Sequence, residues 1–429
     1  MRVAVIGTGY VGLVTGVVLA QLGNHVICVD NDPEKVKKLR QGIPPIYEPD
    51  VEDLLKKGLA AGFLCISDSI EEAAENSDII MIAVGTPPGF DGAPDMTAVK
   101  AVASEIAKSI KHYTVIVNKS TVPVGSGDVV EKILLDAGVK PDMFDVVSNP
   151  EFLREGSAVY DTLHPDRIVI GAKSKEAADK LVELYHPLGS PVHITDLASA
   201  ELIKYASNSF LATKISFINA ISRICELSGA NVGDVAKGMG ADRRIGDQFL
   251  QAGLGWGGSC LPKDVQGLIK TGERLGYNFE LLQAVSDINE DQTANFVRRL
   301  DRRLGGFEEK TIGLLGLAFK PNTDDIRDAK SLVIIKEILS KGGKVRASDP
   351  IAEKNVRQVF PQITYLKSAY EVAKGSDALL LVTEWSEFRG LDWDMIALLL
   401  KQKIVFDGRR VYDRGALEKS GIEYHTIGS

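Results

Sequence analysis

The 429-residue sequence predicts an α/β protein in which two doubly wound, mostly parallel sheets are joined by a long-helix central domain. Three observations carry this prediction. Short β-branched runs alternate with helical patterns in the first half, and a long helical pattern without Gly or Pro follows at residues 199–228. The strand–helix alternation then restarts after a Gly-Gly pair. We therefore expect domains at residues 1–198, 199–304 and 305–429.

The composition is typical of a soluble globular protein, with 45% hydrophobic and 25% charged residues. A net charge of −8 disfavours a nucleic-acid or anionic-membrane partner. No apolar run reaches the ~18–20 residues that span a bilayer. Glycines interrupt the apolar N-terminus, which argues against a signal peptide. We expect a cytoplasmic protein that holds any anionic ligand with local cationic and backbone N–H groups.

The four cysteines show neither a C-x-x-C pair nor metal-ligand spacing, so we predict no metal site and a reducing compartment. Cys28, Cys65 and Cys225 have apolar neighbours, and we expect all three to be small core residues. Only Cys260 lies in polar, glycine-rich surroundings.

The N-terminal segment contains a dinucleotide fingerprint. A predicted strand at residues 2–6 leads into Gly7-Thr8-Gly9-Tyr10-Val11-Gly12 and a helical pattern, and a second predicted strand ends at Asp30. This is G-x-G-x-x-G between strand and helix, with an acid about 20 residues further on. Asp30 would bind ribose hydroxyls and repel a 2′-phosphate, so the predicted cofactor is NAD. A glycine-rich turn in an unrelated α/β fold is the alternative.

Two later predicted strands end in polar turns that contain Thr86 and Thr121. Ligands bind at the carboxyl ends of parallel strands, which places both threonines at the cofactor rim. Either could instead cap a helix. Glu151 and Glu155, after the next strand, belong either to a site or to the solvated surface.

The long helical pattern is apolar around much of its circumference, which indicates burial between domains or subunits and suggests a dimer. Lys204 and Asn208 lie four residues apart on it and point the same way. A lysine on such a helix either has a function or extends to solvent.

Four glycines in six residues precede Cys260, and Lys263 and Asp264 follow it. Glycines let a backbone approach a ligand, and a thiol beside charged groups can act as a nucleophile. A flexible connector is the alternative. The C-terminal half repeats the strand–helix theme without a complete G-x-G-x-x-G, and it either binds a nucleotide-like ligand or is purely architectural.

Taken together, the Gly7–Gly12 turn, the segment 149–155, the Lys204/Asn208 pair and the loop Gly257-Gly258-Ser259-Cys260-Leu261-Pro262-Lys263-Asp264 resemble the UDP-glucose/GDP-mannose dehydrogenase family. The resemblance covers essentially the whole chain, and the order of residues in the Cys260 loop is highly specific. It implies NAD-dependent, four-electron oxidation of the C6 alcohol of a nucleotide sugar to a carboxylate, with two NAD reduced. UDP-glucose is favoured over GDP-mannose and UDP-N-acetylmannosamine, and a homodimer through the central helix is expected.

The family's chemistry maps onto this sequence position by position. Cys260 would attack the C6 aldehyde, and loss of a second hydride would leave a thioester that water hydrolyses. Lys204 and Asn208 match the residues that stabilise the oxyanion. Asp264 matches the acid that assists alcohol deprotonation and water activation.

The remaining assignments also follow the resemblance. Thr121 and Glu155 match residues near the nicotinamide and the catalytic water, and Glu151 matches a general base. Cofactor contacts match Gly7, Gly9, Tyr10, Val11, Gly12, Asp30, Lys35, Thr86, Thr121, Glu155, Lys263 and Arg327. Substrate contacts match Glu151, Phe152, Leu153, Arg154, Glu155, Lys204, Asn208, Arg244, Phe249, Leu250, Gln251, Ala252, Gly253, Gly257 and Lys320. Arg244 would act within its own subunit or across from a partner.

Two rival functions remain open from the sequence. A two-electron dehydrogenase of the 6-phosphogluconate or β-hydroxyacid type would not need Cys260 and would release one NADH per substrate. A nucleotide-sugar-binding regulator without catalysis would release none, although the intact set of reactive residues argues against it.

Overall fold

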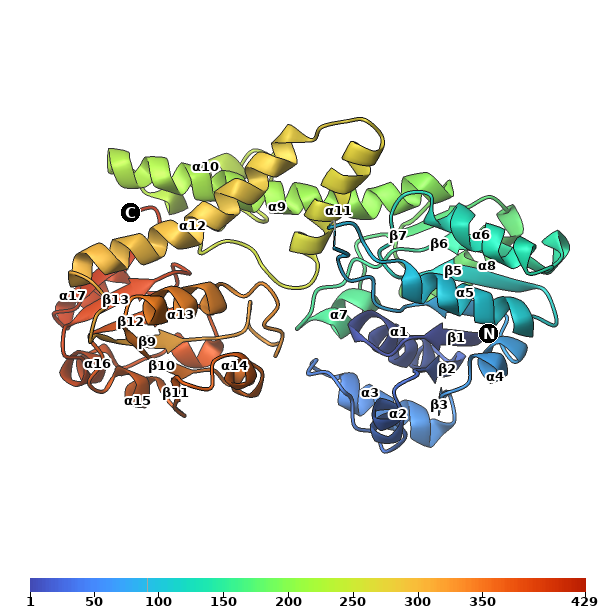
Figure 1. The fold of residues 1–429 in the computed structure, drawn as a ribbon, viewed down its shortest axis with the longest axis horizontal. Helices are drawn as coiled ribbons and strands as arrows, with labels where there is room; N and C mark the ends of the chain where they lie inside the picture. Colours follow the sequence, from blue (N-terminus) through green and yellow to red (C-terminus); the bar gives the residue numbers. More distant parts are fainter. Residues whose placement is uncertain (91) are drawn as a thin grey trace. The chain divides into compact units, whose positions relative to one another are not determined.

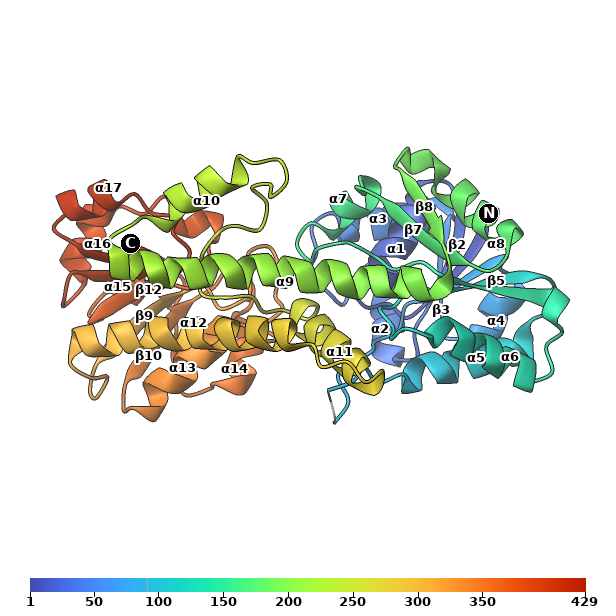
Figure 2. The same cartoon turned by 90° about the horizontal axis from the view of Figure 1, so that it is seen from above.

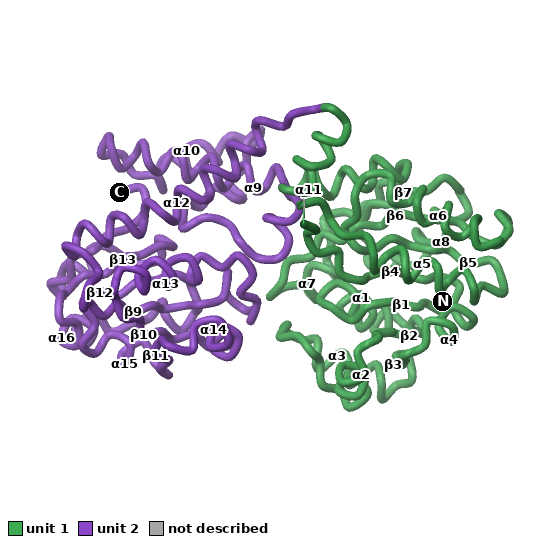
Figure 3. Tube along the Cα trace, in the orientation of Figure 1, with its two compact units in different colours: residues 1–207, 266–276 green, residues 208–265, 277–429 purple. Residues whose placement is uncertain are grey.

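The computed structural model describes residues 1–90 and 92–429. The chain forms two compact units, residues 1–207 with 266–276 and residues 208–265 with 277–429 (Figure 3). Each unit contains one β-sheet (Figure 1). The predicted α/β class, with two parallel-sheet domains and a helical central region, is confirmed.

The sheet of the first unit has the strand order β3-β2-β1-β4-β5-β6-β7-β8 and is parallel except between β6 and β7. Its strands are β1 (Arg2–Ile6), β2 (His25–Val29), β3 (Leu64–Ser67), β4 (Ile79–Ile82), β5 (Thr114–Asn118), β6 (Phe144–Ser148), β7 (Ile168–Ala172) and β8 (Val192–Thr195). The strand order reverses between β1 and β4, and a doubly wound sheet binds its ligand at such a switch point.

Helices cover both faces of this sheet. They are α1 (Tyr10–Gln21), α2 (Pro33–Arg40), α3 (Val51–Ala61), α4 (Ile70–Glu75), α5 (Thr97–Ser109), α6 (Ser126–Asp136), α7 (Ala158–Leu163) and α8 (Lys175–Tyr185). Val3 and Val5 of β1 pack with α1, α2, α3, α7 and α8, whereas Ala4 and Ile6 pack with α4, α5 and α6. Because successive strand residues point to opposite faces, a continuous apolar strand is buried on both sides.

The sheet of the second unit is parallel throughout, in the order β11-β10-β9-β12-β13-β14. Its strands are β9 (Thr311–Leu315), β10 (Lys344–Ser348), β11 (Thr364–Tyr365), β12 (Ala378–Leu381), β13 (Ile404–Asp407) and β14 (Glu423–Thr426). Its helices after residue 276 are α12 (Glu280–Leu304), α13 (Lys330–Ser340), α14 (Glu353–Val359), α15 (Ala369–Ala373), α16 (Trp393–Leu399) and α17 (Arg414–Lys419). One apolar core joins this sheet to residues of α9 and α12.

The long helix expected from the sequence is α9 (Leu197–Ser228), and two further central helices are α10 (Val232–Gly240) and α11 (Leu261–Arg274) (Figure 2). Part of the apolar surface of α9 is exposed within the single chain. Phe210, Phe217 and Ile224 are 64%, 48% and 60% exposed. Residues seven apart lie on one face of a helix, so these three form an exposed apolar stripe.

Local predictions agree with the structure where the apolar pattern is strong. Strand β1 has the predicted bounds, residues 2–6, and the strands predicted before the Thr86 and Thr121 turns are β4 and β5. The prediction of a buried Cys65 was wrong, because its side chain is exposed, whereas Cys28 and Cys225 are buried. Cys65 lies on β3 at the edge of the sheet, where alternate residues face solvent.

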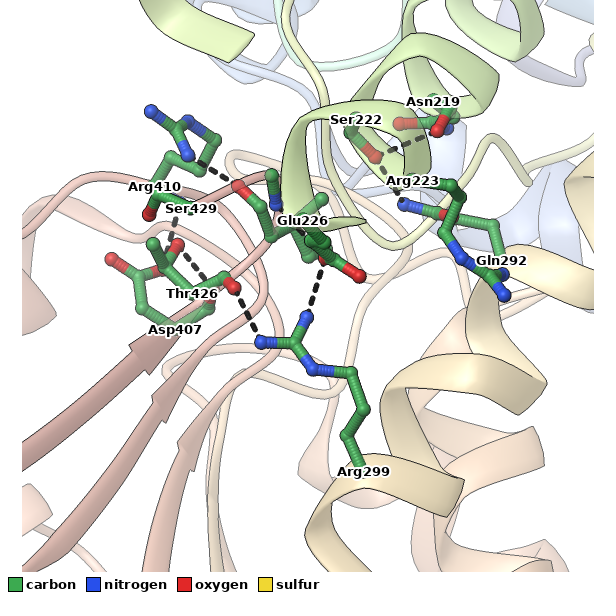
Figure 4. A network of polar contacts seen from close by, with 12 residues as sticks. Asn219, Ser222, Arg223, Glu226, Gln292, Arg299, Asp407, Arg410, Thr426 and Ser429 are labelled. Carbon is green, nitrogen blue, oxygen red and sulfur yellow. Dashed lines mark hydrogen bonds and ion pairs between the residues drawn. The ribbon is translucent and has the colours of Figure 1, made fainter. Parts of the chain in front are cut away.

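The C-terminal segment is held by polar contacts within the second unit (Figure 4). Glu226 of α9 accepts hydrogen bonds from an Arg299 Nη1 at 2.5 Å and from the Gly428 backbone N–H at 2.9 Å. The other Arg299 nitrogen, Nη2, donates to the Thr426 carbonyl at 2.9 Å. These bonds fasten the last strand to α9 and α12.

Across residues 1–90 and 92–429, no helix combines the length and apolar character that crossing a membrane requires.

Candidate active site

The three fingerprint glycines have different surroundings. Gly7 has a φ of +101°, which only glycine adopts readily, and a Cβ at Gly12 would lie 1.9 Å from the Gly7 carbonyl oxygen. Nothing lies within 4 Å of a Cβ built on Gly9. Gly7 therefore makes the turn, Gly12 lets helix and strand pack closely, and Gly9 leaves space for a ligand to approach.

The N-terminus of α1 suits a pyrophosphate. In the described part of the chain its N-cap, Gly9, provides no side-chain hydrogen bond, and its first turn contains no acidic residue. Backbone N–H groups and the helix dipole at such an end favour an anion. The residues present therefore fit the phosphates of a dinucleotide.

Asp30 follows β2 and is 8% exposed. Its carboxylate accepts hydrogen bonds from the Thr8 backbone N–H at 3.0 Å, the Thr8 hydroxyl at 2.5 Å and the Asp32 N–H at 3.0 Å. Lys35 Nζ lies 3.8 Å from it. Burial raises the pKa of Asp30, but these hydrogen bonds and Lys35 outweigh burial and lower the pKa below its usual value. An ionised carboxylate here is the group that ribose hydroxyls would donate to.

The two predicted rim threonines contact each other. The Thr86 hydroxyl, in the loop after β4, donates to the Thr121 carbonyl, after β5, at 2.9 Å. Neither residue is a helix cap, since α5 and α6 are capped by Met96 and Gly125. The capping alternative for these threonines was therefore wrong.

Glu151 and Lys204 form a buried ion pair in the first unit. The Glu151 Oε1 to Lys204 Nζ distance is 2.9 Å, and the side chains are 6% and 3% exposed. The other Glu151 oxygen accepts the Leu153 N–H at 2.8 Å. Lys204 thus does not extend to solvent, and Glu151 is not a surface acid. Glu155, at 7% exposure, is also buried.

Phe152 and Arg154 lie in the same segment, which is a loop and not a helix. The Arg167 guanidinium stacks 3.6 Å above the Phe152 ring centroid, and Lys204 Nζ lies 5.4 Å from that centroid. Arg154 forms a bidentate pair with Asp161 at 2.9 and 2.7 Å. The segment therefore carries an aromatic face flanked by cations.

In the second unit, α9 and α12 hold the loop that leads to Cys260. The Gly253 N–H donates to Asn219 Oδ1 at 2.9 Å, and the Trp256 N–H donates to Asn289 Oδ1 at 2.7 Å. The Trp256 indole donates to the Ser216 hydroxyl at 3.0 Å. Trp256 thus has a defined partner for its ring N–H.

The glycines next to Cys260 let the loop pack against residues 319–328. A Cβ at Gly257 would lie 2.2 Å from the Asp328 carbonyl oxygen, and one at Gly258 would lie 2.6 Å from the Phe319 ring. The Gly258 N–H also donates to the Arg327 carbonyl at 2.9 Å. At these two positions the missing side chain makes room for protein.

Cys260 directly precedes α11 and is half-buried. The partial positive charge at a helix N-terminus stabilises negative charge on a sulfur placed there. In the first turn of α11, Asp264 is 1% exposed, and its carboxylate accepts from Asn208 Nδ2 at 2.6 Å and from Lys263 Nζ at 2.7 Å. Lys263 therefore compensates the carboxylate charge that would otherwise oppose a thiolate.

The other predicted substrate residues are spread over the second unit. Phe249 has a φ of +64°, an uncommon conformation for a bulky residue. Leu250 and Ala252 are buried in the core, so only their backbone atoms are available to a ligand, whereas Gln251 is exposed. Arg244 is 89% exposed and pairs with Asp242 at 2.6 Å.

Lys320 and Arg327 follow β9. Lys320 Nζ lies 5.3 Å from the Phe319 ring centroid. Arg327 is 58% exposed and forms a bidentate pair with Asp325, with distances of 2.7 to 3.0 Å. Both residues belong to the segment against which the Cys260 loop packs.

The sequence did not single out three further cations, one in the first unit and two in the second. Lys119 is buried after β5, and Lys330 is buried with its Cε 3.2 Å from a Cβ built on Gly255. Arg409 Nη1 lies 3.7 Å from a Cβ built on Gly253. For Lys119, the sequence feature that could have indicated a buried cation is its position directly after an apolar strand. Lys330 and Arg409 have no comparable sequence feature.

The fold and these side chains define an NAD-dependent oxidoreductase that has two nucleotide-binding-type sheets and a cysteine at the N-terminus of α11. Three family models match, all of the UDP-glucose/GDP-mannose dehydrogenase family: the NAD binding domain over residues 1–189, the central domain over 198–291 and the UDP binding domain over 313–414. The chain belongs to this family.

Relatives match over the full length. UDP-glucose 6-dehydrogenase YwqF of Bacillus subtilis is 48% identical over 429 residues, which cover 100% of this chain and 98% of the relative. UDP-glucose 6-dehydrogenase TuaD of the same organism is 47% identical, over 100% of this chain and 93% of the relative. The structure of a UDP-glucose dehydrogenase from Pyrobaculum islandicum superposes with a TM-score of 0.93 at 39% identity, covering 99% of this chain and 97% of the other.

Proposed function

We propose that the protein oxidises the C6 alcohol of UDP-glucose to a carboxylate, as a UDP-glucose 6-dehydrogenase that reduces two NAD per substrate. The observation that carries the proposal is the cluster at α11, where Cys260 stands at the helix N-terminus and Asp264 accepts hydrogen bonds from Asn208 and Lys263. The names of the full-length relatives support the choice of substrate.

In the first oxidation, Asp264 assists removal of the proton from the C6 hydroxyl. Bound NAD supplies the hydride acceptor for each of the two oxidations. Cys260 sulfur then adds to the C6 aldehyde: a C–S bond forms, and the carbonyl π electrons move onto oxygen. Lys204 and Asn208 stabilise that oxyanion by an ammonium and an amide donor.

Loss of a second hydride from C6 converts the thiohemiacetal into a thioester. A water oxygen then attacks the carbonyl carbon, Asp264 assists loss of its proton, and the C–S bond breaks to return the thiolate of Cys260. Asn208 has two amide hydrogens. Because one of them donates to Asp264, the side chain is oriented, and the other stays available to the oxyanion.

On the cofactor side, Gly9 and the N-terminus of α1 would hold the pyrophosphate, and Asp30 the adenosine ribose. Thr86 and Thr121 line the strand ends near the nicotinamide in this assignment. Lys320 and the backbone of residues 249–257 would contact the nucleotide sugar, and Arg327 would contact the cofactor.

The test is the number of NADH formed per UDP-glucose consumed by the purified protein. Two NADH and one UDP-glucuronate are expected; one NADH would indicate a two-electron dehydrogenase, and none would indicate a binding protein. A panel with GDP-mannose and UDP-N-acetylmannosamine tests the substrate, and a higher kcat/KM for either would overturn the choice of UDP-glucose.

We also propose that the protein is a homodimer that pairs through α9. The apolar stripe of Phe210, Phe217 and Ile224 supports this, because it presents large exposed apolar side chains at heptad spacing. Light scattering after size exclusion tests it. We expect a dimer for the wild type and a monomer for Phe217→Glu, whereas Leu398→Glu, at a 79% exposed apolar position on α16, leaves the mass unchanged. A monomeric wild type would contradict the proposal.

A further inference from the structure

Lys119, directly after β5, is a buried cation to which the reaction chemistry above gives no role. Its side chain is 8% exposed, and Nζ donates a hydrogen bond to Asn149 Oδ1 at 3.0 Å. Among residues 1–90 and 92–429, no carboxylate oxygen lies within 4 Å of this ammonium. Burying a charge without an ion-pair partner is costly, so a stable protein retains one where it serves a purpose.

Asn149 connects Lys119 to the Glu151 segment. Its Oδ1 also accepts from the Tyr185 hydroxyl at 2.6 Å, and its Nδ2 donates to the Val169 carbonyl at 2.8 Å. Asn149 is 1% exposed, and one residue separates it from Glu151. The hydrogen bonds of Asn149 therefore hold the Lys119 ammonium next to the first residues of the Glu151 segment.

Three cations interact with the Glu151 carboxylate. The carboxylate pairs with Lys204 at 2.9 Å and also interacts electrostatically with Lys119 and Arg167. Burial lowers the pKa of Lys119 to about 8; Glu151 opposes this shift and Lys204 adds to it. Burial likewise lowers the pKa of Arg167, and Glu151 is one of two acids that oppose it. Glu151 thus interacts with three cations, of which Arg167 has a second acid, Asp166, beside it.

We propose that Lys119 is a positioning residue of the oxidation proposed above, on which this inference rests: through Asn149 it fixes the entry to the Glu151 segment, and its buried charge prevents Glu151 from neutralising Lys204 completely. The remaining positive charge acts on the oxygen anion that forms at C6. Lys119 itself touches neither substrate nor cofactor in this assignment.

The test compares pH profiles of kcat/KM for UDP-glucose. In Lys119→Met and Lys119→Gln, Lys204 loses a repelling positive neighbour. The alkaline limb of the kcat/KM profile should therefore move to higher pH by on the order of one pH unit. At neutral pH kcat should fall about tenfold, because Glu151 then neutralises more of the Lys204 charge that acts on the oxyanion. The KM for NAD should stay unchanged.

Two control variants separate charge from packing. Tyr185→Phe removes a hydrogen bond to Asn149 without changing the charge, and Lys132→Met removes an exposed lysine that pairs with Asp136 in the same unit. Both should keep the wild-type limb. A shift in Tyr185→Phe as large as that in Lys119→Met would overturn the charge role, because packing around Asn149 would then explain it.

The outcomes distinguish this inference from the proposed function. A wild type that forms no NADH from UDP-glucose overturns the function itself. An active wild type whose folded Lys119→Met and Lys119→Gln variants retain its alkaline limb overturns the positioning role alone. Should Lys119→Met fail to fold, Lys119→Gln decides, because glutamine can still donate to Asn149.

Discussion

Both sheets begin with the same order of strand, helix and adjacent parallel strand. The loops that connect the first strand to the first helix differ in length. In the first unit α1 begins four residues after β1, with the open Gly9 at its cap. In the second unit α13 begins at Lys330, long after β9 ends at Leu315. The longer loop carries residues 316–329 toward the Cys260 loop, where the Arg327 carbonyl accepts the Gly258 N–H. The same topology thus forms an anion-binding turn in one case and a support for the reactive loop in the other.

The two units also differ in the surroundings of the acid that follows the second strand, Asp30 in the first unit and Asp349 in the second. Asp30 accepts from Thr8 and the Asp32 N–H. Asp349 accepts the backbone N–H groups of residues 317, 318, 351 and 352, and also the Trp385 indole N–H at 3.0 Å. The indole covers the carboxylate that a ribose would need. The position of an acid in this topology therefore does not by itself make a ribose site.

The largest expected effect concerns the supported loop of the second unit. Cys260→Ser should lower NADH formation by at least about 10³-fold, because the aldehyde can no longer be held as a thioester precursor. Binding of UDP-glucose, measured by calorimetry, should remain. Normal UDP-glucuronate production by this variant would refute the thioester route.

A second prediction uses one buried lysine of each unit, Lys119 in the first and Lys330 in the second. Burial lowers both pKa values, that of Lys119 to about 8 from 10.5. The protonated lysine at position 119 therefore destabilises the native state. The full destabilisation is present below pH 8, and it disappears as the pH rises to 10.5. At pH 7 the free energy of unfolding of Lys119→Met should exceed that of the wild type by up to about 3 kcal/mol.

Urea unfolding at pH 7, 8.5 and 10 measures this difference. The gain should shrink steadily between pH 8 and 10.5, the window set by the Lys119 pKa. Lys330→Met should show the same sign. A difference that is independent of pH would mean that lost packing, and not the buried charge, determines the result.

Gly258→Ala tests the support of the reactive loop. A Cβ there would meet the Phe319 ring at 2.6 Å, and the φ of +83° disfavours alanine, so we expect a loss of about 2 kcal/mol in unfolding free energy. Activity should fall as Cys260 moves. The matched control is Gly238→Ala in α10, where nothing lies within 4 Å of the new Cβ. Equal stability of the two variants would contradict a close packing role for Gly258.

The smallest expected effect separates the two acids. Asp30→Ala should weaken NAD binding about tenfold and narrow its preference over NADP, because the ribose loses a charged acceptor. Asp349→Ala should lower thermal stability but leave NAD affinity unchanged. Fluorescence titration with both cofactors measures the affinities, and an unchanged preference in Asp30→Ala would show that Asp30 is not at the ribose.

Much of the fold could be predicted from local patterns. The apolar runs of β1, β5 and β9 are continuous because both faces of these strands are buried, and the glycine spacing from Gly7 to Gly12 admits one type of turn. Cys65 could not be predicted, because its apolar neighbours are alternate residues of an edge strand. The face of α9 that the single chain leaves exposed could not be predicted either, because an apolar circumference does not reveal which face the rest of the chain covers.

By itself the sequence determined the strand–helix alternation, the dinucleotide turn, and the presence of a thiol followed by a lysine and an acid. These features depend on neighbours in the chain, where backbone geometry and side-chain period suffice. Tertiary structure alone decided that Asp264 accepts hydrogen bonds from both Asn208 and Lys263. It also decided that Glu151 forms an ion pair with Lys204 and that Lys119 donates to Asn149. Asn208 and Asp264, for example, lie 56 residues apart in sequence. Only the folded core brings such charges together, and the low dielectric of that core makes their arrangement matter.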